Sequence, residues 1–350
     1  MAIPSFDVRL DPSRHVSVAM ATYNGMPYLP EQLESILAQT RPADEIVICD
    51  DCSTDDTWSY LEQQSKKHPT IRLFRNDHNL RSTRNFERAI RECTGNVIFL
   101  SDQDDLWAAT KIEAQLHHML TTGAVLVMSD GDLVDAMGQK MGATLWQSNG
   151  ITDRIKAQLE SDSPWQVLPF NFFITGCATC FDTSLRRLFV PIPAFAWHDA
   201  WIAAVASVAH PGRIALMEQK LIGYRQHGRN QIGAKATPLW NGGLAVANSK
   251  MERIFRELRS FDDVKCQSHF VAALIERTQH RDFPKVADAQ SFLRAIAEGD
   301  KHCARRISYV KRSTSLLRIF HPTMLAGYFR YSKGITTIIR DILVRLMRTA

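Results

Sequence analysis

Short apolar runs alternate with amphipathic stretches along the first 130 residues of the chain. Apolar runs rich in β-branched side chains predict strands, and an apolar repeat of three to four residues between them predicts helices. The predicted strands are 15–21, 45–49, 71–75, 97–100 and 124–128, and the predicted helices are 28–39, 55–67, 83–93 and 108–120. This alternation is typical of right-handed βαβ units. It predicts an α/β fold with a mainly parallel central sheet and flanking helices.

The pattern changes further along the chain. Residues 131–170 are predicted to be irregular, and a second structured block is predicted over 172–224, with a helix over 200–209. Beyond residue 238, amphipathic patterns predict helices over 248–258, 268–277, 287–297 and 335–347. We therefore predict an α/β domain over residues 1–233 and an α-helical C-terminal extension over residues 234–350.

Composition and charge narrow the class of protein. The 350 residues are 45% hydrophobic and 23% charged, which is ordinary for a globular protein. We find no apolar run of the ~18 residues that a membrane-spanning helix needs, and no apolar signal core at the N-terminus. Seven scattered cysteines fit a reduced setting, so a cytoplasmic location is expected. Cys49/Cys52 and Cys177/Cys180 could form a zinc site, but buried packing is the favoured interpretation.

The positive charge is concentrated at the C-terminal end. The net charge is +5, yet residues 301–350 hold eleven Lys/Arg and one acidic residue, so the rest of the chain is net negative. Large apolar residues are interleaved with these cations, which is typical of helices that lie on anionic membranes. We therefore hypothesise peripheral contact of this basic tail with an anionic membrane. Packing on the body of the protein, or a role in solubility, is the alternative.

The segment 97–107 carries the strongest chemical signal. An apolar strand is followed at once by three carboxylates, Asp102, Asp104 and Asp105. Like charges on one loop repel, so a cation is expected beside them. Oxygen ligands of this kind suit Mg²⁺ or Mn²⁺, which bind a few carboxylates together with substrate phosphates. A solvated turn without metal is the alternative.

Two further polar loops follow the first two predicted strands. These are the segments Thr22-Tyr23-Asn24-Gly25 and Asp50–Thr57. There is no glycine-rich dinucleotide motif and no Walker loop. Because the carboxyl ends of parallel strands meet at one edge of a sheet, the loops predict a nucleotide held by side chains, with a metal neutralising its phosphates.

Five motifs together resemble family 2 glycosyltransferases of the GT-A fold, and the resemblance covers roughly residues 14–233. They are Thr-Tyr-Asn-Gly, Asp-Asp-Cys-Ser-Thr-Asp-Asp-Thr, Ser-Asp-Gln-Asp-Asp-Leu-Trp, Trp-His-Asp-Ala-Trp from position 197 and Tyr-Arg-Gln-His-Gly from position 224. The Asp-Gln-Asp-Asp-x-Trp form is similar to the rhamnosyltransferase-like branch. The resemblance implies a metal-dependent inverting glycosyltransferase that makes cell-surface polysaccharide. The donor would be a dTDP- or UDP-sugar, with rhamnose a candidate, and the acceptor a saccharide or lipid-linked saccharide; no nucleic acid is involved.

The resemblance also implies donor-binding roles. Asp50 would accept a hydrogen bond from the pyrimidine, Thr22 and Asn24 would line the same pocket, and Asp102 would face the ribose or the metal. Family members usually carry glycine where this chain has Arg81, which adds a phosphate contact. A second departure is Cys52, which replaces the commoner glycine in its loop.

The remaining implied roles concern the metal and the proton. Asp104 would be the principal metal ligand, Asp105 would assist it, and His227 would approach the metal or the diphosphate. Asp199 would be the general base, and a plain helix N-cap is the alternative for it. Trp107 and Trp201 are expected to pack in the core.

Two other functions remain open at this point. A nucleotide-sugar-binding module without turnover would keep the fold, although Asp104 and Asp199 are both present. A nucleotidyltransferase would also place a metal at strand ends, but its usual glycine-rich phosphate loop is missing. A location at the inner face of the plasma membrane is the corresponding hypothesis for the lipid-linked acceptor.

Overall fold

The structure is a computed structural model that describes residues 14–171, 173–227, 261–284, 286, 289–311, 322 and 324–325. Within these residues, nine strands form one mixed sheet in the order β3-β2-β1-β4-β8-β6-β9-β5, with β7 paired to β6. The strands are β1 (Val16–Thr22), β2 (Glu45–Asp50), β3 (Ile71–Arg75), β4 (Val97–Ser101), β5 (Leu106–Trp107), β6 (Leu126–Val134), β7 (Lys140–Thr144), β8 (Thr179–Asp182) and β9 (Ile214–Arg225).

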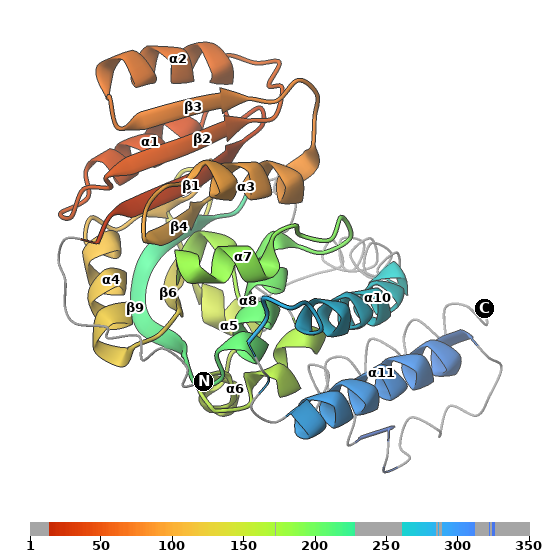
Figure 1. Cartoon of the computed structure of the whole chain (residues 1–350). Coiled ribbons are helices and arrows are strands. Elements are labelled where there is room, and N and C mark those ends of the chain that lie inside the picture. The colour runs from red at the N-terminus through yellow and green to blue at the C-terminus, as the bar shows by residue number, and fades with distance from the viewer. Residues whose placement is uncertain are drawn as a thin grey trace, which may run out of the picture.

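Helices cover the sheet and extend it at the C-terminal end (Figure 1). The α-helices are α1 (Leu29–Leu37), α2 (Thr57–Lys67), α3 (Arg81–Glu92), α4 (Lys111–Thr122), α5 (Leu145–Asn149), α6 (Asp153–Leu159), α7 (Arg186–Phe189), α8 (His198–Ala209), α10 (Phe261–Thr278) and α11 (Ala289–Lys311). Short 3₁₀ helices are η1 (Pro164–Gln166), η2 (Leu168–Phe170), η3 (Gly176–Ala178) and η4 (Thr183–Leu185).

The first four predicted strands and the helices between them are confirmed. β3, β2, β1 and β4 are parallel, and β1 and β2 are almost wholly buried, as expected for strands covered on both faces. In the register, Thr22 lies beside Asp50 and Met20 beside Ser101. The loops that follow β1, β2 and β4 therefore leave the sheet at one edge, which is where the polar motifs were predicted to meet.

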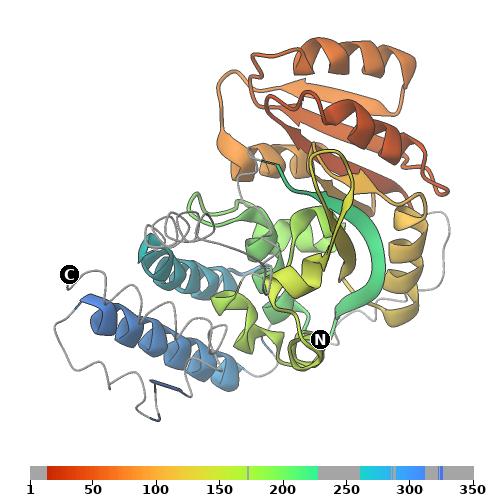
Figure 2. The same ribbon diagram turned by 180° about the vertical axis from the view of Figure 1, so that it is seen from behind.

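The later half of the sheet is mixed. β8 runs antiparallel to both β4 and β6, whereas β9 runs parallel to β6 and antiparallel to β5. β9 follows a curved path around the molecule (Figures 1 and 2), and its register with β6 shifts at Asp130. Such shifts bend a strand. The bend carries the end of β9 to β5, next to the acidic loop after β4.

The prediction that residues 131–170 are irregular is wrong. This stretch holds the end of β6, then β7, α5, α6, η1 and η2. These elements are too short to show a clear period. Two helix caps were the signal that was missed: the hydroxyl of Thr144 accepts from the Gln147 N–H in a capping box, and the hydroxyl of Thr152 accepts from the Ile155 N–H.

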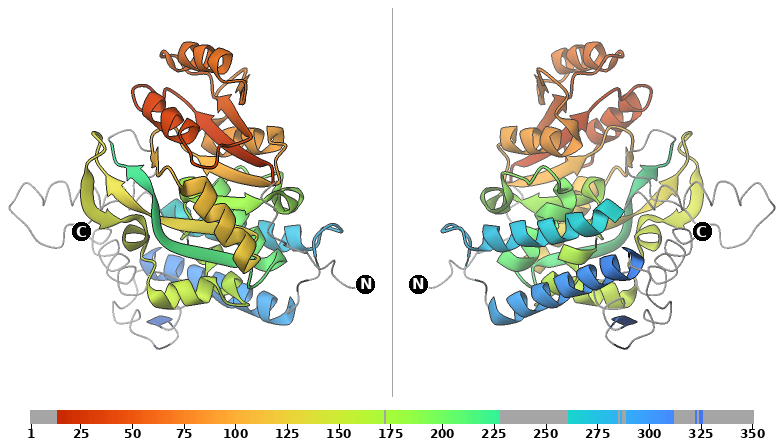
Figure 3. Two further views of the ribbon diagram at one scale, coloured as in Figure 1. Left: turned by 90° about the vertical axis from the view of Figure 1, so that its left-hand side faces the viewer. Right: turned by 90° about the vertical axis from the view of Figure 1, so that its right-hand side faces the viewer.

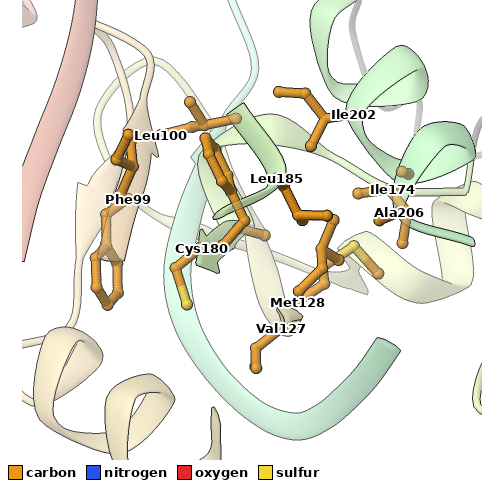
Figure 4. Close-up of a cluster of buried hydrophobic side chains, with 14 of the residues drawn as sticks. Phe99, Leu100, Val127, Met128, Ile174, Cys180, Leu185, Ile202 and Ala206 are labelled. Atoms are coloured by element: carbon orange, nitrogen blue, oxygen red, sulfur yellow. The ribbon is translucent and has the colours of Figure 1, made fainter. Parts of the chain in front are cut away.

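One core lies between the central strands and α8. Figure 4 shows Leu100 of β4 and Met128 of β6 on the side of the sheet that faces Ile202 and Ala206 of α8, whereas Phe99 and Cys180 point to the other side. α8 is buried along almost its whole length, which explains why it is apolar on every side rather than amphipathic. Truncating one of these buried side chains to alanine should cost ~2–5 kcal/mol of stability.

The described part of the C-terminal extension packs on the domain through α8. α10 and α11 run side by side, away from α2 and β3 (Figures 1 and 3). Phe270 of α10 meets Trp201 of α8 edge to face at 5.3 Å, and the Arg277 guanidinium donates to the carbonyl of Pro191 at 3.0 Å. Helices predicted over 268–277 and 287–297 are confirmed and are longer than expected.

Other predictions for this end of the chain lie outside the described residues. They are the helices over 248–258 and 335–347, the boundary near residue 233 and most of the basic tail. Among the helices that the structure describes, none has both the length and the apolar character needed to cross a bilayer.

Candidate active site

A cleft of about 900 Å³ opens at the edge of the sheet where β1 and β4 end. Seven of the nine predicted site residues line it: Thr22, Asn24, Arg81, Asp102, Asp104, Asp199 and His227. The other two, Asp50 and Asp105, are buried and do not line it. The fold thus gathers in one cleft residues that are up to 205 positions apart in the sequence.

Asp50 organises the loop after β2 from behind the cleft wall. Its Oδ1 accepts from the hydroxyls of Thr22 and Ser53, and its Oδ2 accepts from the Ser53 N–H at 3.0 Å. The Arg75 Nε lies 3.5 Å from the same carboxylate, which is fully buried. These contacts occupy the carboxylate within the protein. A direct contact of Asp50 with a pyrimidine therefore stays a prediction that this arrangement does not favour.

Its neighbour Asp51 ties the same loop to the start of α3. The carboxylate accepts from the N–H of Leu80 at 2.7 Å and of Arg81 at 2.9 Å, and from the amide of Asn76. These bonds hold Arg81 at φ +66°, in the left-handed region that favours glycine. The backbone at this position therefore suits the glycine that the resemblance predicted here. The exposed guanidinium of Arg81 has no ion pair within the described residues and borders the cleft.

The first loop is held by two neighbours. The Asn24 backbone is also left-handed, at φ +48°, and its side-chain oxygen accepts from the Thr54 N–H at 2.8 Å. The Gln103 amide bonds to both the N–H and the carbonyl of Tyr23, at 2.8 and 3.0 Å. Gln103 therefore joins the loop after β1 to the acidic loop. The sequence motif contained it, but its role was not predicted.

His227 and Asp104 meet in the cleft. The His227 Nε2 lies 2.8 Å from the Asp104 Oδ2, and the imidazole stacks on Tyr28 with centroids 4.5 Å apart. Arg225, the last residue of β9, holds the acidic loop in position beside His227. The buried Arg225 donates its N–H to Asp105 at 3.0 Å and its Nε to the Asp104 carbonyl at 2.8 Å, and it pairs with Glu31 of α1. Arg225 belongs to the Tyr-Arg-Gln-His-Gly motif, but no role for it was predicted from the sequence.

Burial and mutual repulsion disfavour the ionised forms of Asp102 and Asp105 in the acidic loop. Burial and then the nearby Asp104 raise the pKa of Asp105 to about 7, although the Cys177 thiol, the Arg225 N–H and Lys111 act against this. Burial, followed by repulsion from Asp105 and Asp104, also raises the pKa of Asp102. The Asp105 Oδ2 has no hydrogen-bond partner among the described residues. Carboxylates with an imidazole are a suitable ligand set for Mn²⁺ or Mg²⁺, so these residues fit the predicted cation.

Asp199 is the second residue of α8, and Trp197 occupies the N-cap position. The plain N-cap alternative for Asp199 is therefore not what the structure contains. Its Oδ2 accepts from the Gly176 N–H at 3.1 Å and its Oδ1 from the Ala200 N–H at 2.8 Å. The carboxylate is thus held in place by one backbone N–H of η3 and one of the first turn of α8.

Two cleft residues beside Asp199, Trp197 and His198, were not predicted to take part in the site. The Trp197 side chain is 39% exposed at the rim. His198 is buried and stacked on Phe86 at 3.9 Å, and neither ring nitrogen has a hydrogen-bond partner among the described residues. Burial lowers the pKa of His198, which keeps it neutral. By contrast, Trp107 and Trp201 are buried, as expected.

The paired cysteines do not meet as a four-cysteine zinc site. In the part of the chain that the structure describes, the one cluster with metal-ligand spacing is Asp102, Asp105 and Cys177. Cys49 and Cys180 are buried, in agreement with the packing interpretation.

Comparisons with known proteins show which families and structures this chain is similar to. The family model for Glycosyl transferase family 2 matches residues 17–176. The UDP-Glc:alpha-D-GlcNAc-diphosphoundecaprenol beta-1,3-glucosyltransferase WfaP of Escherichia coli is 37% identical over 106 residues, which are 30% of this chain and 41% of that protein. The dTDP-rhamnosyl transferase RfbG of Shigella flexneri is 26% identical over 231 residues, covering 61% and 74% of the two chains. The chain spans about half the length of the curated relatives it matches.

Two solved structures share the fold. The S. aureus TarS fragment 1–349 in complex with UDP-GlcNAc has a TM-score of 0.53 at 13% identity, covering 94% of this chain and 89% of that one. The mannosyltransferase PcManGT from Pyrobaculum calidifontis, in complex with GDP-Man and Mn²⁺, has a TM-score of 0.54 at 17% identity, covering 98% and 91%. Residues 17–176 thus match the family 2 glycosyltransferase model, and the architecture shared with these two structures confirms the expected GT-A fold.

Proposed function

We propose that this protein is a metal-dependent, inverting glycosyltransferase. It moves a sugar from a nucleoside-diphosphate donor to a saccharide or lipid-linked saccharide in the synthesis of a cell-surface polysaccharide. The observation that carries the proposal is the joint placement, in one cleft, of the Asp104–His227 pair and the helix-start carboxylate Asp199. One supplies a cation site for a diphosphate, and the other supplies a base for a hydroxyl.

The donor binds between the loops that follow β1, β2 and β4. Thr22 and Asn24 line this side, and the Arg81 guanidinium reaches the diphosphate, because it is the exposed cation of the cleft wall. A dTDP- or UDP-sugar is the proposed donor. The names of WfaP and RfbG state UDP-Glc and dTDP-rhamnose for those proteins, and the TarS fragment was solved with UDP-GlcNAc.

Asp104, Asp105, Asp102 and His227 would hold the divalent cation, Mn²⁺ or Mg²⁺. A cation bound there neutralises the charge that grows on the departing diphosphate. The protein's own part is to keep the ligands in place: Arg225 fixes the backbone of the loop, and the Tyr28 ring sets the plane of the His227 imidazole.

Asp199 takes the proton from the acceptor hydroxyl as the oxygen attacks the anomeric carbon. Direct attack from the face opposite the diphosphate inverts the anomeric centre. The exposed Trp197 gives the acceptor sugar an apolar surface at the rim of the cleft on this side. Cytoplasmic location, with the basic tail on the inner face of the plasma membrane, completes the proposal for a lipid-linked acceptor.

The test is a turnover assay with a panel of dTDP- and UDP-sugars, Mn²⁺ and lipid-linked or free saccharide acceptors. We expect release of nucleoside diphosphate that is abolished by EDTA and by Asp104→Asn. Asp153→Asn, at an exposed position of α6, is the matched control and should leave turnover unchanged. Release of pyrophosphate would indicate a nucleotidyltransferase instead, and tight donor binding without any release would indicate a silent binding module.

A further inference from the structure

A sulfur atom lies among the carboxylates behind the cleft. One carboxylate oxygen of Asp102, one of Asp105 and the Sγ of Cys177 all lie within 4.8 Å of one another. The cysteine comes from η3, more than 70 positions after the acidic loop. The other cysteines whose side chains the structure describes, Cys49, Cys52, Cys93 and Cys180, belong to no such cluster within the described residues. Cys177 is therefore distinguished by its neighbours and not by its burial.

The backbone around Cys177 is held on both sides. The buried Lys111 donates from its Nζ to the Cys177 carbonyl at 2.8 Å, and the same ammonium lies 3.9 Å from the Trp107 ring centroid. On the other side, the Gly176 N–H donates to the Asp199 carboxylate at 3.1 Å. These contacts fix where the thiol stands. A metal site requires this kind of rigid support for its ligands.

A second observation points to a ligand in this cluster. Asp105 is 1% exposed, and while its Oδ1 accepts from the Arg225 N–H, its Oδ2 accepts no hydrogen bond of normal geometry among the described residues; the Cys177 thiol is the polar group beside this carboxylate. Leaving a buried carboxylate oxygen without a donor is costly. Oxygen atoms from two carboxylates and one sulfur, at this spacing, match the ligands of a cation rather than of an anion or a hydrophobic group.

We propose that Cys177 is a cation ligand, so that Asp102, Asp105 and the Cys177 Sγ form a site for thiophilic divalent cations such as Cd²⁺ and Zn²⁺. On binding, the thiol proton passes to solvent and the sulfur lone pair forms the bond to the cation. Mg²⁺ demands oxygen ligands, whereas thiolate favours Zn²⁺ and softer ions. The site shares Asp102 and Asp105 with the proposed function, so thiophilic cations compete there with Mn²⁺ or Mg²⁺.

The inference rests on the proposed function only through these shared carboxylates, and its test needs no nucleotide sugar. The full chain is titrated with Cd²⁺ and followed by thiolate-to-metal charge-transfer absorption in the ultraviolet and by calorimetry. Cys177→Ser removes the thiol at nearly constant size. Cys180→Ser is the matched control, because Cys180 is equally buried three residues further along, outside the cluster.

We expect the absorption in the wild type and in Cys180→Ser, and its loss in Cys177→Ser. Cd²⁺ affinity should fall at least about tenfold in Cys177→Ser, while Mg²⁺ affinity should change little. Even residues that only hydrogen-bond to a metal ligand contribute about this much to metal affinity. Cd²⁺ binding to the wild type without this absorption, or equal absorption in Cys177→Ser, overturns the proposal.

Two further measurements keep the result interpretable. If Cys177→Ser does not fold, as judged by circular dichroism, Asp105→Asn should weaken Cd²⁺ binding with the thiol still present; undiminished binding contradicts the proposal. If the wild type binds Mn²⁺ but shows no thiolate-to-metal absorption with Cd²⁺, the cation site at Cys177 is refuted and the proposed function is not affected. Failure of the wild type to bind any divalent cation removes the metal site of the proposed function as well.

Discussion

Arg81 combines a strained backbone with a useful side chain, and two substitutions separate these effects. Its φ of +66° costs a residue with a Cβ ~1–2 kcal/mol, whereas glycine adopts it freely. Glycine in turn loses more chain entropy on folding, ~0.5–1 kcal/mol. Arg81→Gly should therefore be more stable than Arg81→Ala by ~1 kcal/mol. Both variants lack the guanidinium, so this difference reports the backbone alone.

Donor affinity should respond differently from stability. A charge-assisted hydrogen bond contributes ~1.5–3 kcal/mol, which corresponds to roughly ten- to hundredfold in Kd. Arg81→Gly and Arg81→Ala should lose that affinity for UDP or dTDP to the same extent. Arg81→Lys keeps the charge but not the planar fork, so its affinity should lie between those of the wild type and Arg81→Ala.

The assays are urea unfolding at neutral pH for the free energy, and calorimetric titration with UDP or dTDP in Mn²⁺ for the affinity. Equal unfolding free energies of Arg81→Gly and Arg81→Ala would refute the claim that the backbone at position 81 is strained. Unchanged nucleotide affinity in both variants would remove Arg81 from the diphosphate site, even if the strain were found.

Three further predictions concern the base, the core and the tail. Asp199→Asn should lower kcat by ~10²–10⁴-fold with donor affinity nearly unchanged, as steady-state kinetics and donor titration can check; lost affinity with normal kcat would move Asp199 to the donor site. Burial alone would raise the pKa of Glu45, but hydrogen bonds from Ser17, Thr94 and Arg72 outweigh it and lower the pKa to about 2 from 4.5. This stabilises the fold by ~3 kcal/mol above pH 4.5 and is lost as pH falls through about 2. Urea unfolding of wild type and Glu45→Gln should therefore differ at pH 7 and converge in acid, and a pH-independent difference would contradict the assignment. Full-length protein should sediment with anionic liposomes at low salt and not at high salt, and removal of residues 301–350 should abolish this; equal, negligible sedimentation of both leaves the tail without a membrane role.

The sequence predicts the first half of the fold well because its strands are buried on both faces. Such strands read as continuous apolar runs, and the polar loops after β1 and β4 stand out against them. The elements in segment 131–170 could not be predicted in this way, because elements such as β7 and α5 are only five residues long and show no clear hydrophobic period. The bend of β9 also depends on register shifts that only the assembled sheet contains.

The site divides in a similar way. Loop residues such as Asp104 and Arg81 reach the cleft because the chain leaves parallel strands at one edge. Asp50 does not line it, because Thr22 of β1 and Ser53 of the loop after β2 donate to its carboxylate. The contact of the Lys111 ammonium with the Cys177 carbonyl, and of the Cys177 thiol with Asp102 and Asp105, arises where η3 packs near the acidic loop. These segments are distant in the sequence, so no local sequence pattern predicts the contacts.

The most direct test of the central claim is a calorimetric titration of the full chain with UDP and dTDP, in Mn²⁺ and in EDTA, for the wild type and Asp104→Asn. We predict nucleotide binding by the wild type that requires Mn²⁺ and is lost in Asp104→Asn, while circular dichroism of the variant stays native. Equal binding in EDTA, or undiminished Mn²⁺-dependent binding by Asp104→Asn, would contradict a cation-assisted nucleotide site at the Asp104–His227 pair.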